Sequence, residues 1–553
     1  MSLAKHDFPR FSDEYGKRWR KAGLWLDITL HQGFDNTVAA QPDKVALITA
    51  ERRFTLAEYK AESDALAAGL LGIGIGPNDI VAVQLPNWVE FCFLQIALSR
   101  IGAVIQPIHM VFREREVANL VSFCDSDAIV VPETYKDFNH AEMVRALRHK
   151  LPTLRNVLIT RGDARKSAGE SSLNELIEEG RRNLDRLARV SPTAEDIFYL
   201  NFTSGTEGDP KGFLHIHNSV ISMTQRLIQL MPKDTVMLAC SPMTHTFGHF
   251  EMYYTDLAGF PMVVVDRYNP TQILQQIDRE RVTKLSGTPA HLIGLLQHPD
   301  FDKYDTKSIR SVAVGGARSS PGLISDLQRV WGVKSANTYG MGETIIHTRT
   351  VPDDPPEIIR TTVGRPIHGV ELKIVDQSNR SRVQPADSIG EICFRGPTLF
   401  VGYHNQPEKT AETRDSEGWF YTGDLGFVDE RGYLHFVGRA KEVINRGGTK
   451  IHPKEIEDLL CQHPAVLQAA VVGMPDERLG ERVCAYVVVR EGHSLTLEEA
   501  REFFAVQKAM KYLHPEILLI LDEMPMTPTG KIQKVTLQQD AARRAKASAK
   551  AAS

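Results

Sequence analysis

Short hydrophobic runs alternate with longer segments of helical periodicity through the first part of the chain. The hydrophobic runs stand at 45–50, 80–85 and 128–132, and the helical segments stand at 57–75 and 89–102. Apolar runs of this length are typical of buried strands, and their alternation with helices predicts βαβ units around a parallel sheet. We therefore expect the chain to open with an α/β domain.

Strand and helix signals continue past a polar stretch at 161–189, which we interpret as an exposed helix or loop insertion. Apolar runs within 236–284 bracket a helical stretch, and another run at 311–316 ends in a glycine turn. From about residue 364 the pattern changes to short strands separated by turn residues, which predicts a smaller β unit. Beyond residue 439 a new pattern of helices and strands begins. We place a domain boundary between Gly438 and Glu442.

Composition narrows the class of protein. The chain has 553 residues, of which 42% are hydrophobic and 24% charged, so it is typical of soluble globular proteins and long enough for several domains. A formal charge of -4 provides no general field for nucleic acid, and we expect no nucleic-acid partner. The six cysteines are dispersed and never form a CxxC pair, which argues against a disulfide framework or a zinc knuckle.

The sequence also indicates where the protein works. The N-terminal segment has no apolar core of a signal peptide. The apolar stretch at 91–112 is interrupted by Arg100, Gln106 and His109, so we expect no integral membrane segment. We predict a cytoplasmic protein whose cysteines stay reduced.

The most informative motif is a loop rich in Gly, Ser and Thr. The segment 198–218 reads FYLNFTSGTEGDPKGFLHIHN, in which a strand-like run enters the loop and Lys211 closes it. Glycines let backbone N–H groups approach an anion, hydroxyls add donors and lysine adds charge, so the loop suits phosphate. Its spacing is not that of a Walker loop, because Lys211 follows proline and precedes glycine. His215 and His217 form a lone HxH pattern, to which we assign no catalysis.

Three further motifs offer groups for a nucleotide. The segment NTYGMGET at 337–344 contains an aromatic ring for a purine and Glu343, a hard ligand of the kind Mg²⁺ uses beside triphosphate oxygens. The segment 418–457 contains Asp424, which can accept hydrogen bonds from a ribose diol, and a charged transition between two composition patterns. The segment PMTPTGK at 525–531 brings one lysine into a proline-bracketed loop. Each motif alone is more often an ordinary turn.

In this order and at these separations, the four motifs resemble the adenylate-forming superfamily, which includes acyl-CoA synthetases, adenylation domains of peptide synthetases and beetle luciferases. The resemblance covers nearly the whole chain. It implies an α/β fold with a large N-terminal AMP-binding domain of parallel and mixed sheets with helices and a small β unit, at 1–438. It further implies a small mobile α+β C-terminal domain at 439–553 that carries the catalytic lysine.

The resemblance also implies roles for individual residues in binding ATP. The ATP and AMP site would contain Thr203, Ser204, Gly205, Thr206, Glu207, Gly208, Lys211, Gly315, Gly316, Ala317, Asn337, Tyr339, Gly340, Met341, Thr344, Asp424 and Arg439. The loop at 203–212 would surround the β- and γ-phosphates, and Tyr339 would stack on adenine with Asn337 near the adenine edge. Thr344 would contact the α-phosphate. Asp424 would bind the ribose with help from Arg439.

The remaining roles concern the metal, the acid and the thiol. Glu343 would hold Mg²⁺ with Thr203, and Lys531 would bridge the substrate carboxylate and the α-phosphate. Lys441 would be the hinge of the small domain. The pair Gly447-Gly448 would border the channel for coenzyme A. The acyl pocket would be formed by His245, Phe247, Phe250, Thr288 and His347, and His245 would also act beside the reacting groups.

Two positions depart from the pattern of the superfamily. Glu207 stands in the phosphate loop where threonine or serine is usual, and a carboxylate beside a triphosphate is unfavourable unless it points away or recruits a cation. Gly342 stands where a threonine or serine hydroxyl is common. Lys211, Glu343 and Lys531 are all retained.

The expected reaction is therefore the ATP-dependent activation of a carboxylic acid to an acyl adenylate, followed by transfer to coenzyme A. The segment at 241–250 has no asparagine of the kind found in relatives that adenylate hydroxylated aromatic acids, so we expect a cyclic, aromatic or short-to-medium aliphatic acid. The alternatives are an enzyme that loads a carrier protein and a homologue that binds nucleotide without turnover. A nicotinamide oxidoreductase is disfavoured because the glycine run at 72–77 follows a helix. The oligomeric state is left open, with a homodimer as one option.

Overall fold

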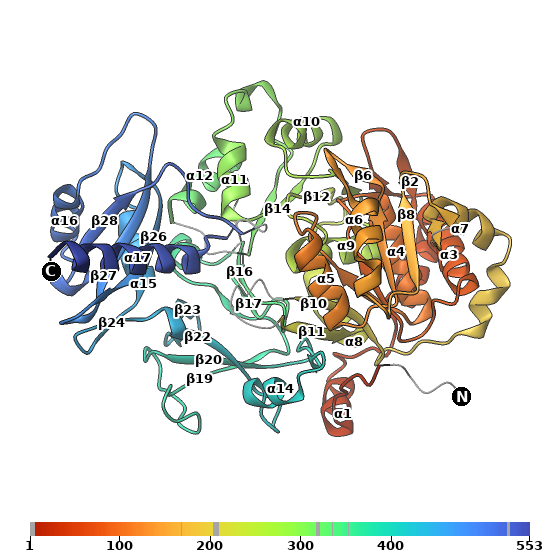
Figure 1. The fold of residues 1–553 in the computed structure, drawn as a ribbon, viewed down its shortest axis with the longest axis horizontal. Helices are drawn as coiled ribbons and strands as arrows, with labels where there is room; N and C mark the ends of the chain where they lie inside the picture. The colour runs from red at the N-terminus through yellow and green to blue at the C-terminus, as the bar shows by residue number, and fades with distance from the viewer. Residues whose placement is uncertain are drawn as a thin grey trace.

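The computed structural model describes residues 6–166, 169–202, 210–316, 321–333, 336–351, 353–527 and 531–552. Within these ranges the chain forms a large N-terminal part and a small C-terminal part, which lie side by side in Figure 1. Two large sheets with helices and one antiparallel sheet build the large part, and a smaller mixed sheet builds the other. This arrangement confirms the predicted α/β class with a large and a small domain.

The first large sheet positions most of the candidate site. In the described chain it has nine strands in the order β18 (Arg365–Pro366), β17 (Thr348–Arg349), β16 (Ala336–Tyr339), β15 (Ser311–Val314), β14 (Lys284–Gly287), β12 (Met237–Ala239), β13 (Met262–Val263), β1 (Val45–Ile48) and β2 (Arg53–Thr55). The central strands are parallel, so the carboxyl ends of β14, β15 and β16 meet at one edge. Ligands of parallel α/β sheets bind at such an edge.

The second large sheet contains the two strands that flank the predicted phosphate loop in the sequence. Among the described residues its order is β21 (Gly402–Tyr403), β11 (Gly212–Ile216), β10 (Ile197–Phe202), β4 (Val104–Pro107), β3 (Ile80–Val83), β5 (Ala128–Pro132), β8 (Asn156–Thr160) and β9 (Glu170–Ser172). The prediction of an exposed insertion at 161–189 is wrong in part. This stretch supplies β9 and helix α7 (Leu173–Arg181), which buries Leu173, Leu176 and Ile177. Their spacing puts an apolar stripe on the helix, which must be covered.

Helices cover the faces of both sheets and fill the space between them (Figure 1). Their bounds are α1 (Asp13–Lys21), α2 (Leu30–Ala40), α3 (Leu56–Gly72), α4 (Val89–Ile101), α5 (Glu114–Phe123), α6 (His140–Leu147), α8 (His217–Ile228), α9 (Thr246–Ala258), α10 (Pro270–Glu280), α11 (Pro289–Leu296), α12 (Pro321–Trp331) and α13 (Pro356–Thr361). The largest hydrophobic core joins α2, α3, α4 and α9 to strands of both sheets. A two-stranded ribbon, β6 (Thr134–Tyr135) and β7 (Phe138–Asn139), lies outside them.

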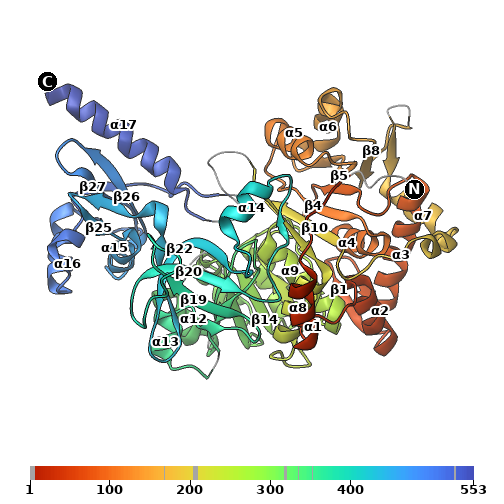
Figure 2. The same cartoon turned by 90° about the horizontal axis from the view of Figure 1, so that it is seen from below.

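The third sheet leads into the small domain. It is antiparallel, with β19 (Glu371–Val375), β20 (Gly390–Arg395), β22 (Phe420–Val428) and β23 (Leu434–Arg439), and helix α14 (Pro407–Thr413) precedes β22. The short 3₁₀ helix η5 (Ala440–Glu442) then lies at the predicted boundary. The small domain contains β24 (Ile444–Arg446), β25 (Thr449–Ile451), α15 (Pro453–Leu460), β26 (Val466–Asp476), β27 (Gly480–Val489), α16 (Leu497–Val506), β28 (Ile517–Ile520) and α17 (Lys534–Ala552). Figure 2 shows α17 extending away from the large domain.

Candidate active site

A cavity of about 2000 Å³ opens between the carboxyl edge of the nine-stranded sheet, helix α9, the β22–β23 hairpin and the small domain. It brings together most of the predicted residues that the structure describes. These are Lys211, His245, Phe247, Phe250, Gly315, Gly316, Tyr339, Gly340, Met341, Glu343, Asp424, Arg439, Lys441 and Lys531. The predicted phosphate-loop residues Thr203, Ser204, Gly205, Thr206, Glu207 and Gly208, together with Ala317, lie outside the described residues.

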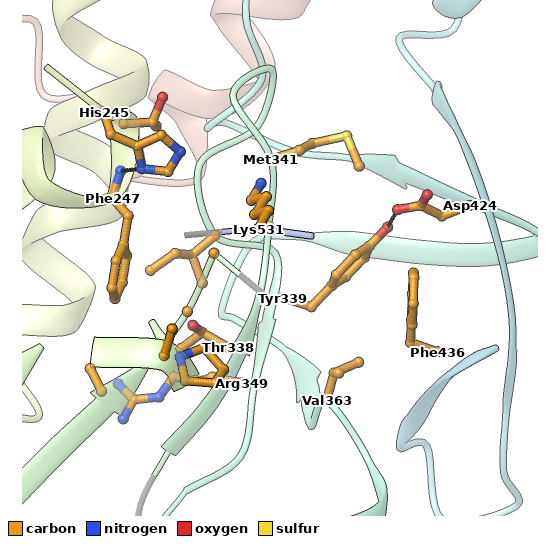
Figure 3. Close-up of a pocket in the computed structure, with 18 of the residues that line it drawn as sticks. His245, Phe247, Thr338, Tyr339, Met341, Arg349, Val363, Asp424, Phe436 and Lys531 are labelled. Atoms are coloured by element: carbon orange, nitrogen blue, oxygen red, sulfur yellow. Dashed lines mark hydrogen bonds between the residues drawn. The ribbon is translucent and has the colours of Figure 1, made fainter. Parts of the chain in front are cut away.

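The β22–β23 hairpin sets the position of the acidic group predicted to bind ribose. Asp424 and Arg439 are direct partners in the antiparallel register, and Arg439 Nε lies 3.7 Å from Asp424 Oδ1. The Tyr339 hydroxyl donates a 2.5 Å hydrogen bond to Asp424 Oδ2 (Figure 3). Burial raises the pKa of Asp424 to about 6, although Arg439 and the Tyr339 bond oppose the rise. The Asp424 carboxylate is therefore less well solvated in the cavity than it would be in water.

The Tyr339 ring lies in an aromatic wall. Its centroid is 5.5 Å from that of Phe436, which comes from β23, and 6.0 Å from that of Phe394. Burial and the Asp424 carboxylate raise the pKa of Tyr339 well above its usual value, so the phenol stays protonated and can donate. The wall is aromatic with a hydrogen-bonded rim at Asp424, and an aromatic face beside a ribose-binding carboxylate suits a purine nucleoside.

Glu343 lies in a tight turn after β16. Gly340 is required there, because a Cβ atom would stand 1.8 Å from the Ile345 carbonyl oxygen. Ile345 adopts a φ of 68°, a strained conformation for a β-branched residue of the kind that occurs at functional sites. A Cβ atom at Gly342 would stand 2.2 Å from the Phe213 ring. A serine or threonine side chain at position 342, which is common in the superfamily that the sequence resembles, therefore has no room beside Phe213.

The carboxylate of Glu343 is buried and partly satisfied. It accepts a 2.7 Å hydrogen bond from the Tyr403 hydroxyl, and Lys211 Nζ lies 6.0 Å from the Tyr403 ring centroid. Burial raises the pKa of Glu343, whereas the Tyr403 bond and the charges of Lys211 and Arg439 lower it. Tyr403 comes from β21 in the other large sheet, and the sequence motifs did not identify it.

Lys531 reaches the large domain from the small one. Two hydrogen bonds join Lys531 to Thr527, from the Thr527 amide to the Lys531 carbonyl (2.7 Å) and from the Lys531 amide to Thr527 Oγ1 (3.0 Å). Figure 3 shows the side chain between His245 and Tyr339. Burial and the charge of Arg439 lower the pKa of Lys531 to about 8, against the opposing effect of Asp424 and Glu343.

His245 caps the N-terminus of α9. Its Nδ1 accepts a 3.3 Å hydrogen bond from the Phe247 amide, which leaves Nε2 as the protonated nitrogen of the neutral ring. Burial and the neighbouring Lys531 lower its pKa well below the usual value. The ring stacks on His109, whose Nδ1 is 2.9 Å from the Thr244 hydroxyl. His245 can therefore act as a neutral donor but not as a cation.

Four predicted residues of the ATP site and the acyl pocket that the structure describes do not line the cavity. Thr288 caps α11 with His291, and Asn337 donates its amide to the carbonyl oxygens of Ile359 and Thr362. The His347 ring contacts the Thr344 hydroxyl, and both residues are buried beside the strained turn. Their side chains thus build the walls from behind, and direct ligand contacts by these four residues stay predictions.

The predicted hinge and thiol channel lie at the start of the small domain. Lys441 lines the cavity from η5, and the adjacent Glu442 pairs with Lys534 at 3.0 Å. Gly447 and Gly448 form the exposed β24–β25 turn outside the cavity, with φ values of 56° and 90° that favour glycine. Their contact with coenzyme A stays a prediction.

None of the helices that the structure describes has an apolar run sufficient to span a bilayer. No cluster of three or more His, Cys, Asp or Glu side chains gathers as a metal site in the described ranges.

Comparison with known proteins agrees with this geometry. Residues 34–404 match the family model described as AMP-binding enzyme, and residues 455–531 match that of the AMP-binding enzyme C-terminal domain. The chain is 33% identical to the medium-chain fatty-acid–CoA ligase of Escherichia coli (strain K12), covering 97% of this chain and 94% of the relative. It is also 33% identical to 2-hydroxy-7-methoxy-5-methyl-1-naphthoate–CoA ligase of Streptomyces carzinostaticus, covering 97% of each.

Solved structures have the same architecture. The crystal structure of ATP-bound MatB from Rhodopseudomonas palustris superposes with a TM-score of 0.83 at 27% identity, over 94% of this chain and all of that one. The predicted resemblance is confirmed by the length of these matches and by the arrangement of the cavity. This chain belongs to the family of AMP-binding enzymes, within the adenylate-forming superfamily.

Proposed function

We propose that the protein is a carboxylic acid–CoA ligase. In the first step a carboxylate oxygen of the acid attacks the α-phosphorus of ATP, and the bond to pyrophosphate breaks. In the second step the thiol of coenzyme A attacks the acyl carbon, its proton is lost, and AMP leaves. The observation that carries the proposal is Lys531, a cation from the small domain placed in the cavity of the large one among Glu343, Asp424 and Arg439.

The first step brings anions together, so it needs fixed positive charge around the transferring group. Lys531 would hold the acid carboxylate against the α-phosphate, and neutral His245 would donate from Nε2 on the acyl side. Lys211 and Arg439 add positive charge on the phosphate and ribose sides of the cavity. Asp424 would accept the ribose hydroxyls, with its orientation held by the Tyr339 bond.

Mg²⁺ fits this donor set. Glu343 offers one buried carboxylate, oriented by Tyr403, and the remaining ligands would be triphosphate oxygens and water. When bound, the ion would neutralise charge on the phosphate oxygens. Thr203, the second predicted ligand, lies outside the described residues.

The second step needs a different arrangement, because Lys531 occupies the space beside the acyl carbon and the Gly447-Gly448 turn lies outside the cavity. We propose that the domain at 439–553 turns about Lys441 after the adenylate forms. This rotation of the domain would withdraw Lys531 and bring Gly447 and Gly448 to the thiol channel. The acyl adenylate is a mixed anhydride that water hydrolyses, so such an exchange of groups is favoured over an opening of the site to solvent.

The acid belongs to the class of cyclic, aromatic or short-to-medium aliphatic acids in this proposal. Relatives along the whole chain are named for medium-chain fatty acids and for a substituted naphthoate, which supports that range. A homodimer in the cytoplasm also stays a prediction.

The test is the Lys531→Ala variant in two separate half-reactions. Acid-dependent ATP–pyrophosphate exchange should fall by about a thousandfold or more, because the removed charge acts in the transition state. Attack of coenzyme A on supplied acyl adenylate should be largely spared. Lys511→Ala, an exposed lysine of the same domain, is the matched control and should behave as wild type. Equal loss in both half-reactions would contradict the assignment.

A panel of acids with ATP, Mg²⁺ and coenzyme A then identifies the reaction. AMP formation that depends on both acid and free coenzyme A supports the ligase. Exchange without thiol-dependent AMP release would indicate a carrier protein as acceptor. Absence of exchange with every acid would indicate a homologue that only binds nucleotide.

A further inference from the structure

One face of helix α9 forms a wall that runs from the reacting groups into the depth of the cavity. Phe247, Phe250, Glu251 and Tyr254 all line the cavity, and their spacing of three, four and seven residues places them on one side of the helix. Tyr254 lies about 10 Å further along the axis than Phe247, at 1.5 Å per residue. The wall begins aromatic beside His245 and becomes polar at Glu251.

Arg349 lies at the polar part of the cavity. It comes from β17, opposite Thr338 of β16, and it is half-buried with its side chain in the cavity lining. In the view of Figure 3, Arg349 lies on the far side of Phe247 from His245. Its Nε donates to the Thr350 carbonyl oxygen at 3.3 Å. Within the described ranges no carboxylate lies at ion-pair distance from Arg349.

The neighbours of Arg349 do not neutralise it. Tyr254 interacts with the charge of Arg349, and burial lowers the pKa of this arginine. Glu251 is already occupied, because Lys284 Nζ lies 2.5 Å from its Oε2 and 2.8 Å from the Ser286 hydroxyl. Glu251 is therefore paired with Lys284 and does not neutralise Arg349.

We propose that the acid substrate carries a second oxygen acceptor at the end remote from its reacting carboxylate, and that Arg349 and Tyr254 bind it. This inference rests on the proposed ligase function and names the substrate class within it. A half-buried guanidinium that no described carboxylate pairs with is costly beside a hydrocarbon tail, whereas a carboxylate or carbonyl oxygen would satisfy it with charge-assisted hydrogen bonds. The separation along α9 suits a medium-length chain or a ring as the spacer.

Matched acids test the proposal. Octanoic acid is compared with octanedioic acid and its monomethyl ester, and benzoic acid with terephthalic acid, by acid-dependent ATP–pyrophosphate exchange. The wild type should have a kcat/KM at least about tenfold higher for an acceptor-bearing member of a series, the size expected of one charge-assisted hydrogen bond. Arg349→Met should remove that preference through KM and leave or improve the plain acid, and Arg349→Lys should restore part of it.

Arg365→Met is the matched control. Arg365 is the cross-strand neighbour of Arg349 on β18, but it is exposed and outside the cavity lining, so this variant should keep the wild-type preference. A wild type that prefers the plain acids in both series would overturn the proposal. So would an Arg349→Met variant that loses equal activity on both members, since that result indicates a structural role.

Binding without turnover separates this inference from the proposed function. The same acids are titrated calorimetrically into wild type and Arg349→Met without ATP. Tighter binding of an acceptor-bearing acid that the variant loses supports the Arg349 contact even if no acid is adenylated. Equal binding of all acids to both proteins contradicts it, whatever the outcome of the exchange assay.

Discussion

The lowered pKa of Lys531 predicts how adenylate formation depends on pH. Burial and Arg439 lower this pKa from 10.5 to about 8. At about 1.4 kcal/mol per pH unit, the charged lysine is disfavoured in the cavity by about 3 kcal/mol relative to water. Because the pKa of Lys531 is lowered, its amine is charged below about pH 8 and neutral above it.

Since the acid and α-phosphate need the charged form, kcat/KM for ATP in the acid-dependent exchange should fall as pH rises through about 8. Bound triphosphate adds negative charge beside the lysine and raises its pKa, so the fall in kcat should come at higher pH. The profile of kcat/KM reports the free enzyme and that of kcat the complex, so the two limbs should separate. Exchange without coenzyme A keeps the thiol from contributing a limb of its own.

Lys531→Arg identifies the group. A guanidinium stays protonated across the whole range, so the limb near pH 8 should disappear even if the rate is reduced by altered geometry. A variant that keeps the limb at the same pH would show that another group titrates, and the reasoning from burial would be refuted.

Two other substitutions give opposite signatures. Asp424→Asn should reduce kcat/KM for ATP but raise the melting temperature of the ligand-free protein near neutral pH. Burial raises the Asp424 pKa from 3.8 to about 6, so removing the charge should relieve up to about 3 kcal/mol of destabilisation. An unchanged or lower melting temperature would contradict this. Gly315→Ala should raise KM for the acid more than KM for ATP, because the new Cβ would stand 2.8 Å from the Phe247 ring; an equal rise in both would count against an acyl role for Phe247.

The sequence motifs identified several residues that line the cavity, but not the side chains that contact them. Asp424 and Arg439 could be named from their motifs, but that they face each other depends on the register of the β22–β23 hairpin. Tyr403 comes from a different sheet and contacts Glu343 only because β21 lies beside β11. Local periodicity carries no information on such long-range pairs.

The acyl side was the least predictable. Strand β17 has only two residues, which is too short for an alternating pattern to be recognised in the sequence. Arg349 was therefore not identified as a cavity residue. His347 and Thr344 contact each other in the tight turn, a pairing that the motifs did not indicate, and their predicted ligand contacts stay predictions. In a turn with a strained residue, neighbours in sequence point in directions that no helical or strand period describes.

The charges of the site explain why these residues are kept in one cavity despite their cost. Burial raises the pKa values of Asp424 and Glu343 and lowers that of Lys531, so each group is disfavoured in its charged form although opposite charges are near. A structural ion pair of good geometry would show the opposite shifts. Groups that are all displaced toward neutrality are typical of a site that a polar ligand completes, and in the proposed reaction ATP with Mg²⁺ and the acid would supply the hydroxyls, the anions and the metal. Binding energy from these contacts is then available to hold Lys531 in place until the adenylate has formed.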